Sequence, residues 1–574
     1  MNDHSVNNLL RIAQLGLGLG NVVNSMIINQ VYFERVNFNT KLNIEFLCND
    51  VRINNVTFNQ CQFTSNDIFS LLANPHLQSI QFKRITLINL QSIVQYITQC
   101  PRRETPLSFS ITQFTLHQSK KSESLSELIA ALSHPSAQLG HIEVVPKEFT
   151  KVSIIELFGL FTQERLPSCH LLSVHLQAME LVGSLTEKNF VNRTVASQIT
   201  TLRFNHIRMT PDQKNQVLHT FDQHFTNVKH LELLGLACTT PKSFELLVKY
   251  LGAIISLEYL DMSIAKFTES DVPALATAIT QLHQLTELKL NYSSLNIVNS
   301  LKVSQSQSLT NLSLSAYYNG FLNDTSALYL RPNSLCTLTL VSTSFGPALD
   351  PLPGAMKTLL QSCRLLTTLD LRQELGNSAT QEFFEQLAHH TSLSSLTMVL
   401  DNTSFTKENY DFIISQLLLN ETLNTVSLVG YKINDLTVQL GAVALLETIN
   451  ARPSIRSIIL DIDVAGATLT SINGFIQKSN KLHTLTVNSR EVTSSQALEE
   501  MIGAMRQSKS LRYSEIQGTP SAILKHLRSH VQTLIVGEST DHAKQAVFDV
   551  STAAHYQLVP KTFNQSRVIH LMLH

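Results

Sequence analysis

A short leucine-rich pattern that returns every 28 to 29 residues constrains this chain more than any other feature. The pattern is LxxLxL, in which Ile, Val, Phe or Met can replace Leu. Between Ile199 and Leu285 successive copies begin 29, 29 and 28 residues apart. Such a fixed period indicates a stack of similar units rather than several independent globular domains. The copies begin at Ile28, Ile53, Leu77, Leu139, Leu171, Ile199, Val228, Leu257, Leu285, Leu309, Leu335, Leu366, Leu393, Leu423, Ile455, Leu482 and Leu511, with weaker copies near Leu107, Val531 and Val568.

Each copy predicts a short β-strand followed by a helix. We number the repeat from the first leucine of LxxLxL. Side chains alternate along a strand, so the leucines at positions 4 and 6 point into the core and positions 3, 5 and 7 point away from it, onto the exposed face of the sheet. Between strands the apolar spacing becomes helical, as where Leu275, Ile279 and Leu282 fall at i, i+4 and i+7. Pro273 stands near the expected start of that helix, where its missing N–H is tolerated.

One strand and one helix cannot bury their apolar faces alone, but stacked units form a continuous core. Strands of successive repeats would pair in parallel, about 4.8 Å apart. Helices are wider than this spacing, so the stack bends with the strands inside. The predicted fold is an α/β solenoid of about 19 repeats, a horseshoe with a parallel inner β-sheet and outer helices.

These repeats resemble the leucine-rich-repeat superfamily, specifically the long-repeat class typified by ribonuclease inhibitor and the GTPase-activating protein for Ran. The resemblance covers about 90% of the chain. In that superfamily position 9 usually holds Asn or Cys, and the Asn bonds to the backbone of the turn after the strand. Only Cys61 obeys this rule, so we expect atypical turns. The residues at position 9 include Val36, Cys61, Ile85, Met179, Ile207 and Leu236.

The irregular repeats are rich in Asn, Ser, Thr and Gln, and in this they resemble leucine-rich-repeat effectors that intracellular bacterial pathogens inject into host cells. The first apolar stretch is interrupted by Arg11, Gln14 and Asn21, which makes it a poor secretory signal. The resemblance implies a cytoplasmic protein, or one secreted by a non-Sec route into the host cytoplasm.

Charge and cysteine content exclude several classes of partner. Lys and Arg together number 43, Asp and Glu 44, and the net charge is −1. Without a basic excess, nucleic acid and anionic membrane surfaces are not predicted partners. The sequence has no run of about 20 apolar residues, so no membrane span is predicted. The seven cysteines never form CxxC, which indicates reduced thiols.

Both ends of the array depart from the repeat. Residues 1–27 are predicted to form an N-terminal helical cap that ends in the sequence GLGLG. The repeats occupy residues 28–540. Residues 541–574 form either a C-terminal cap, which closes the last strand, or a flexible export or targeting tail. A cap is expected at each end because terminal repeats would otherwise expose the core.

Motifs for catalysis or cofactor binding are weak. The sequence has no GxxxxGK[ST], and GLGLG is not the dinucleotide pattern GxGxxG. His526 and His530 lack the glutamate of HExxH. Cys48 and Asp50 match the CxD motif of bacterial ubiquitin-ligase effectors, but they lie among the first repeats rather than in a helical domain after them. We therefore predict no catalytic, cofactor-binding or metal-binding residues.

A partner protein would meet positions 2, 3, 5 and 7 on the concave face. Exposed aromatic and Arg side chains are common in interfaces, so Tyr259 and its surroundings are the first candidate. Asp370 and Arg372 are the second. The loop with Tyr317, Tyr318 and Phe321 is a further contact candidate. The predicted partner-binding residues are Arg203, His230, Glu232, Tyr259, Asp261, Lys289, Asn291, Asp370 and Arg372.

The sequence thus predicts a non-catalytic scaffold that recruits, sequesters or inhibits a partner protein, in the form of a secreted bacterial effector acting on a host protein. Two alternatives are a regulator that stimulates a GTPase and an adaptor that brings a substrate to a ubiquitin ligase. Since concave side chains should be exposed, replacing Tyr259 and Asp261 together by Ala is expected to leave thermal stability unchanged.

Overall fold

The structure is a computed structural model of the 574-residue chain. It describes residues 27–34, 37–38, 52–63, 74, 76–87, 105–116, 125–134, 137–162, 171–185, 191–238, 240–267, 270–291, 308–316, 334–342, 354–372, 377–400, 407–430, 454–461, 472–477, 482–488, 500, 503–504, 513–519, 533–538, 556–563 and 566–573. The chain forms two compact units, Met1–Ser293 and Ser294–His574. Most of the predicted N-terminal cap, including GLGLG, lies outside the described residues.

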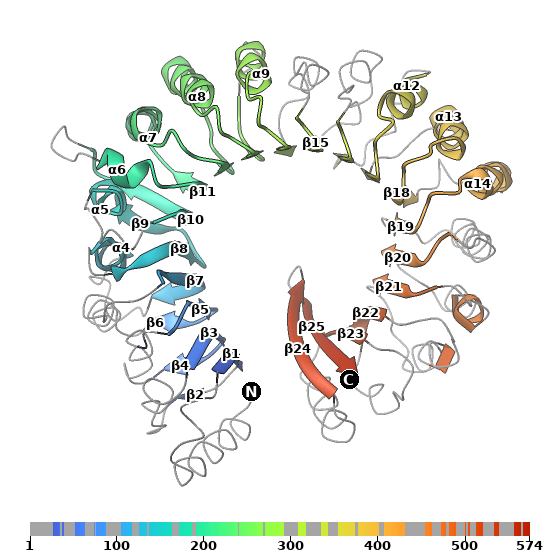
Figure 1. Cartoon of the computed structure of the whole chain (residues 1–574), viewed down its shortest axis with the longest axis horizontal. Helices are drawn as coiled ribbons and strands as arrows, with labels where there is room; N and C mark the ends of the chain where they lie inside the picture. Colours follow the sequence, from blue (N-terminus) through green and yellow to red (C-terminus); the bar gives the residue numbers. More distant parts are fainter. Residues whose placement is uncertain are drawn as a thin grey trace, which may run out of the picture. The chain divides into compact units, whose positions relative to one another are not determined.

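In the first unit, parallel strands form a curved inner sheet and helices lie on its outer side (Figure 1). The main strands are β1 (Ile27–Glu34), β3 (Arg52–Asn59), β5 (Ser79–Lys83), β7 (Leu107–Leu116), β8 (Leu139–Pro146), β10 (Ser173–Val182), β11 (Thr201–Arg208), β12 (His230–Glu232), β13 (Tyr259–Asp261) and β14 (Glu287–Asn291). The helices are α4 (Leu125–Ser133), α5 (Ile154–Gly159), α6 (Arg193–Ala196), α7 (Pro211–His224), α8 (Pro241–Ala253) and α9 (Val272–Thr280). Four short strands follow main strands: β2 (Asn37–Phe38), β4 (Gln62–Phe63), β6 (Thr86–Leu87) and β9 (Thr150–Ser153).

The second unit repeats this arrangement. Its parallel strands are β15 (Asn311–Ala316), β16 (Thr337–Ser342), β17 (Thr368–Arg372), β18 (Ser395–Leu400), β19 (Thr425–Gly430), β20 (Ser457–Asp461), β21 (Thr484–Asn488), β22 (Tyr513–Thr519) and β23 (Thr533–Glu538). Its helices include α12 (Ala355–Ser362), α13 (Asn377–Ala388) and α14 (Lys407–Leu419). Within the described ranges, ten main parallel strands in the first unit and nine in the second agree with the prediction of about 19 repeats. The predicted α/β solenoid is confirmed in each unit.

The last strands of the second unit do not follow the repeat. β24 (Tyr556–Phe563) and β25 (Ser566–Leu573) form an antiparallel hairpin, and β25 pairs antiparallel with β23. The weak copy near Val568 is therefore not a repeat, because its strand runs against the parallel stack. The hairpin lies within residues 541–574, and β25 pairs along β23.

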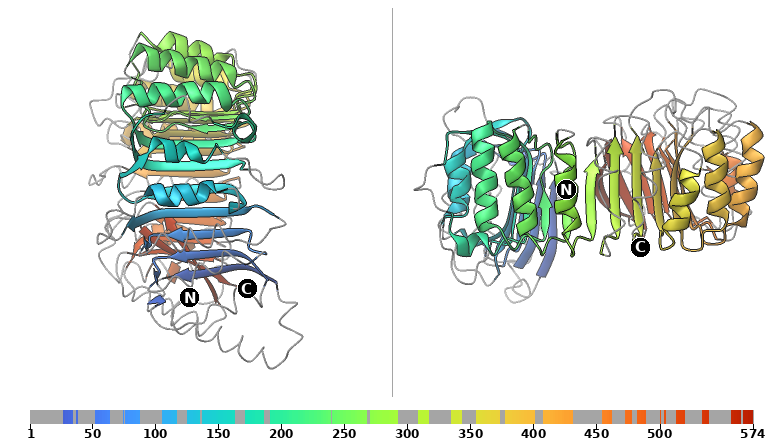
Figure 2. Two further views of the ribbon diagram at one scale, coloured as in Figure 1. Left: turned by 90° about the vertical axis from the view of Figure 1, so that its left-hand side faces the viewer. Right: turned by 90° about the horizontal axis from the view of Figure 1, so that it is seen from above.

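The register of the sheet follows the leucine pattern. Leu202, Leu231, Leu260 and Leu288, all at position 4, are paired in register from β11 to β14, and all four are buried. Helices α7 and α8 lie side by side on the outer side (Figure 2). Each helix begins at a threonine followed by proline, and the threonine hydroxyl accepts a backbone N–H of the first turn.

The backbone of the first unit turns at position 8, where the residue takes a left-handed conformation. Its N–H donates to the carbonyl of position 7 in the next repeat, as from His206 to Leu234 and from Ile264 to Asn291, each at 2.7 Å. These bonds join backbone atoms only, so they place no demand on the side chain. The residues with this conformation at position 8 include Gln60, Arg84, Ala178, His206, Gly235 and Ile264.

This left-handed residue interrupts the alternation of the strand and directs position 9 into the core. Ile85, Ile207 and Leu236 are all buried at that position. An apolar side chain thus stands where leucine-rich repeats usually carry Asn, and the position 8 hydrogen bonds satisfy the turn instead. Cys61, which fits the usual rule, is also buried, and its thiol donates to the carbonyl of Asn59. The atypical turns expected from the sequence have this physical basis.

Candidate functional site

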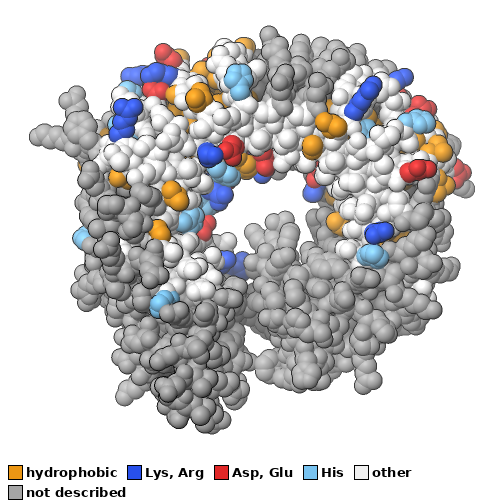
Figure 3. Space-filling view, viewed as in Figure 1, with side chains coloured by type: hydrophobic (Ala, Val, Ile, Leu, Met, Phe, Trp, Pro, Cys, Tyr) orange, Lys and Arg blue, Asp and Glu red, His pale blue; other side chains and the backbone are white. Residues whose placement is uncertain are grey.

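Position 5 of successive repeats forms a row of polar side chains on the inner face of the first unit. Parallel pairing in register places these side chains beside one another from β7 to β14. With their neighbours at positions 3 and 7 we call them the polar lane. Charged and histidine side chains gather along this inner side in Figure 3. The row consists of Ser110, Glu143, His175, Arg203, Glu232, Asp261 and Lys289.

Glu143 is held by neighbours on both sides. His175 Nδ1 lies 2.9 Å from Glu143 Oε1, and the Ser110 hydroxyl donates to Glu143 Oε2. Burial raises the pKa of Glu143, but the hydrogen bonds from His175 and Ser110 outweigh it and lower the pKa to about 2. Glu143 is therefore ionised at neutral pH, and both of its oxygens are occupied.

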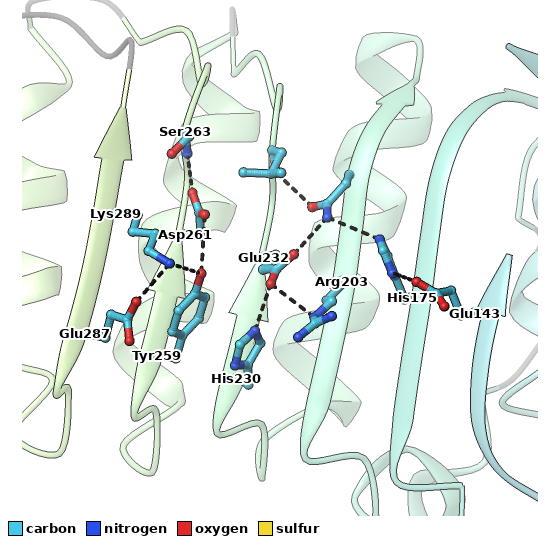
Figure 4. A network of polar contacts seen from close by, with 12 residues as sticks. Glu143, His175, Arg203, His230, Glu232, Tyr259, Asp261, Ser263, Glu287 and Lys289 are labelled. Atoms are coloured by element: carbon cyan, nitrogen blue, oxygen red, sulfur yellow. Dashed lines mark hydrogen bonds and ion pairs between the residues drawn. The ribbon is translucent and has the colours of Figure 1, made fainter. Parts of the chain in front are cut away.

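Asn205, at position 7, links Glu232 to His175, two lane residues that Figure 4 labels. Its Nδ2 donates to Glu232 Oε2 at 2.9 Å and lies 3.4 Å from His175 Nε2. Its Oδ1 accepts the backbone N–H of Leu234 at 3.2 Å, which fixes the orientation of the amide. Since the amide NH2 faces His175, the ring nitrogen Nε2 accepts and Nδ1 carries the proton toward Glu143.

Glu232 is the second carboxylate of which both oxygens have partners. Its Oε1 lies 2.9 Å from His230 Nε2 and 3.0 Å from Arg203 Nε, while Oε2 accepts from Asn205. Burial raises the pKa of Glu232, but the hydrogen bonds from His230 and Asn205, with the charge of Arg203, lower it to about 2. Arg203 and Glu232 form an ion pair, but their contact does not have hydrogen-bond geometry. The buried Nε of Arg203 therefore has no hydrogen-bond acceptor.

Tyr259 is the centre of the next group. The ring of His230 is stacked on it, with centroids 3.8 Å apart and planes 4° apart. Lys289 Nζ donates to the Tyr259 hydroxyl at 3.0 Å, lies 4.9 Å from the ring centroid and pairs with Glu287 at 2.8 Å. Burial lowers the pKa of Lys289, but the bonds to Glu287 and Tyr259 outweigh it and raise the pKa. The ammonium group is thus firmly charged and held over the ring.

The sequence predicted that Asp261 is exposed, but the structure shows that it is buried. It is only 9% exposed, and its Oδ1 accepts the backbone N–H of Ser263 at 2.9 Å. The Tyr259 hydroxyl donates to Oδ2 at 3.4 Å. Burial raises the pKa of Asp261, and the hydrogen bonds to Ser263 compensate only in part. The carboxylate thus binds the backbone just after the C-terminal end of β13, which gives Asp261 a structural role.

The structure brings together seven of the nine predicted residues. Arg203, His230, Glu232, Tyr259, Asp261, Lys289 and Asn291 lie on neighbouring strands of the first unit. Asn291 donates its backbone N–H to the hydroxyl of Ser263 at 3.2 Å. Asp370 and Arg372 form their own ion pair on β17 in the second unit, with Nε and Oδ1 2.9 Å apart. The candidate loop residues Tyr317, Tyr318 and Phe321 lie outside the described residues.

Sequence reasoning missed Glu143, His175 and Ser110. Glu143 and His175 stand at position 5 of the repeats that begin at Leu139 and Leu171. The rule that selected Arg203 would have found both, had it been applied to the earlier repeats. Ser110 was hidden because its repeat has one residue fewer before Phe109, a register shift seen between β7 and β8.

Among the described residues no cluster of His, Cys, Asp and Glu could hold a metal ion, and no helix is long and apolar enough to cross a membrane. Burial raises the pKa of the Cys238 and Cys363 thiols to about 12, so they stay protonated. The CxD motif at Cys48 and the pair His526 and His530 lie outside the described residues.

The architecture is a ladder of parallel strands, most of which carry the LxxLxL pattern, and in many repeats an outer helix follows the strand. The fold is of the leucine-rich-repeat type. No family model and no curated protein matches the chain. Solved structures similar to it include the leucine-rich repeat-containing protein LegL7 of Legionella pneumophila, with 12% identity, 60% of this chain and 97% of that chain covered, and a TM-score of 0.34. A Bacteroides fragilis protein shares 12% identity over 47% of this chain and 76% of its own, with a TM-score of 0.30.

Proposed function

We propose that this leucine-rich-repeat protein is a non-catalytic scaffold that binds a partner protein on the inner face of its first unit. The polar lane is the observation that supports this proposal. It presents Tyr259, Arg203 and Lys289 on neighbouring strands, and aromatic and Arg side chains dominate the binding energy of many interfaces. Contacts with other lane residues hold these side chains in place before a partner arrives, which lowers the entropy lost on binding.

The protonation states of the lane favour binding over catalysis. A general base works best when its pKa lies near the working pH. Glu143 and Glu232 have pKa values of about 2, and their oxygens are already occupied by neighbouring groups. Such carboxylates orient their neighbours and are poorly suited to removing a proton from a substrate.

Affinity capture with matched lysine variants tests this function. Lys289→Ala removes a lane ammonium that contacts Tyr259 and Glu287. Lys249→Ala removes a lysine that pairs with Asp222 on the outer helices, 2.5 Å away. We expect the first variant to lose a partner that wild type and the second variant retain. Equal capture by all three forms would contradict binding through the lane.

The same capture experiment distinguishes a bacterial effector, a GTPase regulator and a ubiquitin-ligase adaptor. The composition supports our proposal of a secreted bacterial effector, which predicts capture from eukaryotic lysate rather than bacterial lysate. A captured small GTPase whose GTP hydrolysis accelerates would favour the GTPase regulator, and a captured ubiquitin ligase would favour the adaptor. Capture from bacterial lysate alone would contradict the effector proposal and leave the scaffold intact.

A further inference from the structure

The carboxylates of the polar lane already have partners. Glu143 and Glu232 accept hydrogen bonds on both oxygens. Asp261 is nearly buried and accepts from Ser263 and Tyr259. Glu287 pairs with Lys289 of the same strand at 2.8 Å, and Glu258, which borders the lane at position 2, pairs with Lys229 at 2.7 Å. A positively charged group of a partner would therefore compete with internal donors at every one of these carboxylates.

Arg203 is in the opposite position. Its Nε is buried without a hydrogen-bond acceptor, although the Glu232 carboxylate lies 3.0 Å away. Within the part of the chain that the structure describes, no acceptor receives a hydrogen bond from its Nη groups, and Figure 4 shows the guanidinium joined only to Glu232. The side chain is 34% exposed. Arg203 is thus held in place by charge while its terminal N–H donors stay available.

We propose that Arg203 binds a carboxylate of the partner protein, the side chain of an Asp or Glu on a segment that docks against the polar lane. This inference rests on the proposed function and adds the chemistry of the partner. A planar guanidinium offers two parallel N–H donors that match the two oxygens of a carboxylate. Glu232 stabilises the orientation of Arg203, so little side-chain entropy is lost when the carboxylate binds.

The surroundings of Arg203 are consistent with an incoming anion. His230 lies beside it on β12, and both side chains contact the same oxygen of Glu232. Lys229, one residue before His230, adds an exposed ammonium that is shared with Glu258. The nearest negative charge is Glu232 itself, and it is already compensated by Arg203 and by hydrogen bonds from His230 and Asn205. An arginine placed between an internal and an external carboxylate can interact with both.

Selection from a displayed library of random ten-residue peptides tests the proposal on the full-length protein. We expect the selected peptides to be enriched in Asp and Glu relative to the unselected library. A fluorescent copy of the most enriched peptide should lose on the order of tenfold or more in affinity when Arg203 becomes Gln, since a charge-assisted bidentate contact is removed. Arg203→Lys keeps the charge but lacks the fork, so its affinity should lie between the two.

Arg193→Gln on α6 is the matched control, because it removes an exposed arginine from the outer helices. It should bind the peptide like wild type. Thermal unfolding of each variant shows whether Arg203→Gln remains folded, and Arg203→Lys gives a second reading if it does not. Peptides that depend on Lys289 but show no acidic enrichment, or bind Arg203→Gln as wild type, would overturn this inference and leave the scaffold proposal standing. An empty selection would contradict both.

Discussion

The imidazole of His230 lies flat on the ring of Tyr259, with 3.8 Å between the ring centroids and 4° between the planes. The two residues occupy position 3 of consecutive repeats and are paired in register on β12 and β13. Parallel strands place equivalent side chains about 4.8 Å apart, which is close to stacking distance. The repeat period therefore creates this contact between residues 29 positions apart in the chain.

The stack predicts different effects for two substitutions of Tyr259. Tyr259→Ala removes the ring from His230 and Lys289 and should lower the free energy of unfolding by about 0.5–1.5 kcal/mol beyond the loss of buried area. Tyr259→Phe keeps the stack and loses only the hydroxyl that Lys289 and Asp261 share. Urea unfolding of both variants measures the difference. A Phe variant as unstable as the Ala variant would show that the hydroxyl, not the ring contact, stabilises this region.

Asp261 should tolerate Asn much better than Ala. Asp261→Ala leaves the buried N–H of Ser263 without its acceptor, at an expected cost of about 1–3 kcal/mol in the free energy of unfolding. Asp261→Asn keeps an acceptor at Oδ1 and removes a carboxylate whose pKa is raised by burial. We therefore expect the double variant with Tyr259→Ala and Asp261→Ala to be destabilised, contrary to the expectation from the sequence. Unchanged urea midpoints for Asp261→Ala would show that Ser263 finds another acceptor.

The rows of the lane were predictable because strand alternation and the repeat period are local properties of the sequence. Arg203, Glu232 and Lys289 follow from position 5 alone. The sequence did not reveal that the carboxylates of the lane already have partners, because these partners lie one repeat away. Asn205 is an example, and its amide is held by the backbone of Leu234. The turn at position 8 was also hidden, because its hydrogen bonds join backbone atoms only and no side chain marks it.

Acid should destabilise the first unit through Glu143 and Glu232. Their pKa values of about 2 in the folded protein lie below the ordinary value of 4.5, so their stabilisation is fully present above about pH 4.5 and is lost as the pH falls toward 2. Each carboxylate should contribute on the order of 2 kcal/mol after allowance for partial exposure. Urea unfolding between pH 2 and 7 measures this loss.

Two glutamine variants separate the lane from the rest of the surface. Glu232→Gln should unfold more easily at neutral pH and show a smaller loss of stability in acid than wild type. Glu258→Gln removes an exposed carboxylate that pairs with Lys229, so it should keep the wild-type acid profile. Identical acid profiles for Glu232→Gln and wild type would show that another group causes the acid sensitivity.

Ile264 should be replaceable with a gain in stability. Its φ of 61° lies in the left-handed region, which a β-branched side chain rarely adopts, and its side chain is 39% exposed, so little packing is lost on substitution. The N–H bond to Asn291 belongs to the backbone and survives any non-proline substitution. Ile264→Asn should raise the free energy of unfolding by about 1 kcal/mol, because Asn tolerates this conformation better.

Gly235→Ala, at the same position of the preceding repeat, should have the opposite effect. Gly235 has a φ of 73°, and a Cβ built there would meet Nδ1 of His206 at 2.8 Å. The variant adds both backbone strain and a steric contact, so it should be destabilised by at least about 1 kcal/mol. Thermal and urea unfolding of the two variants give the comparison. If Ile264→Asn is destabilised as well, side-chain packing rather than backbone conformation determines stability at position 8.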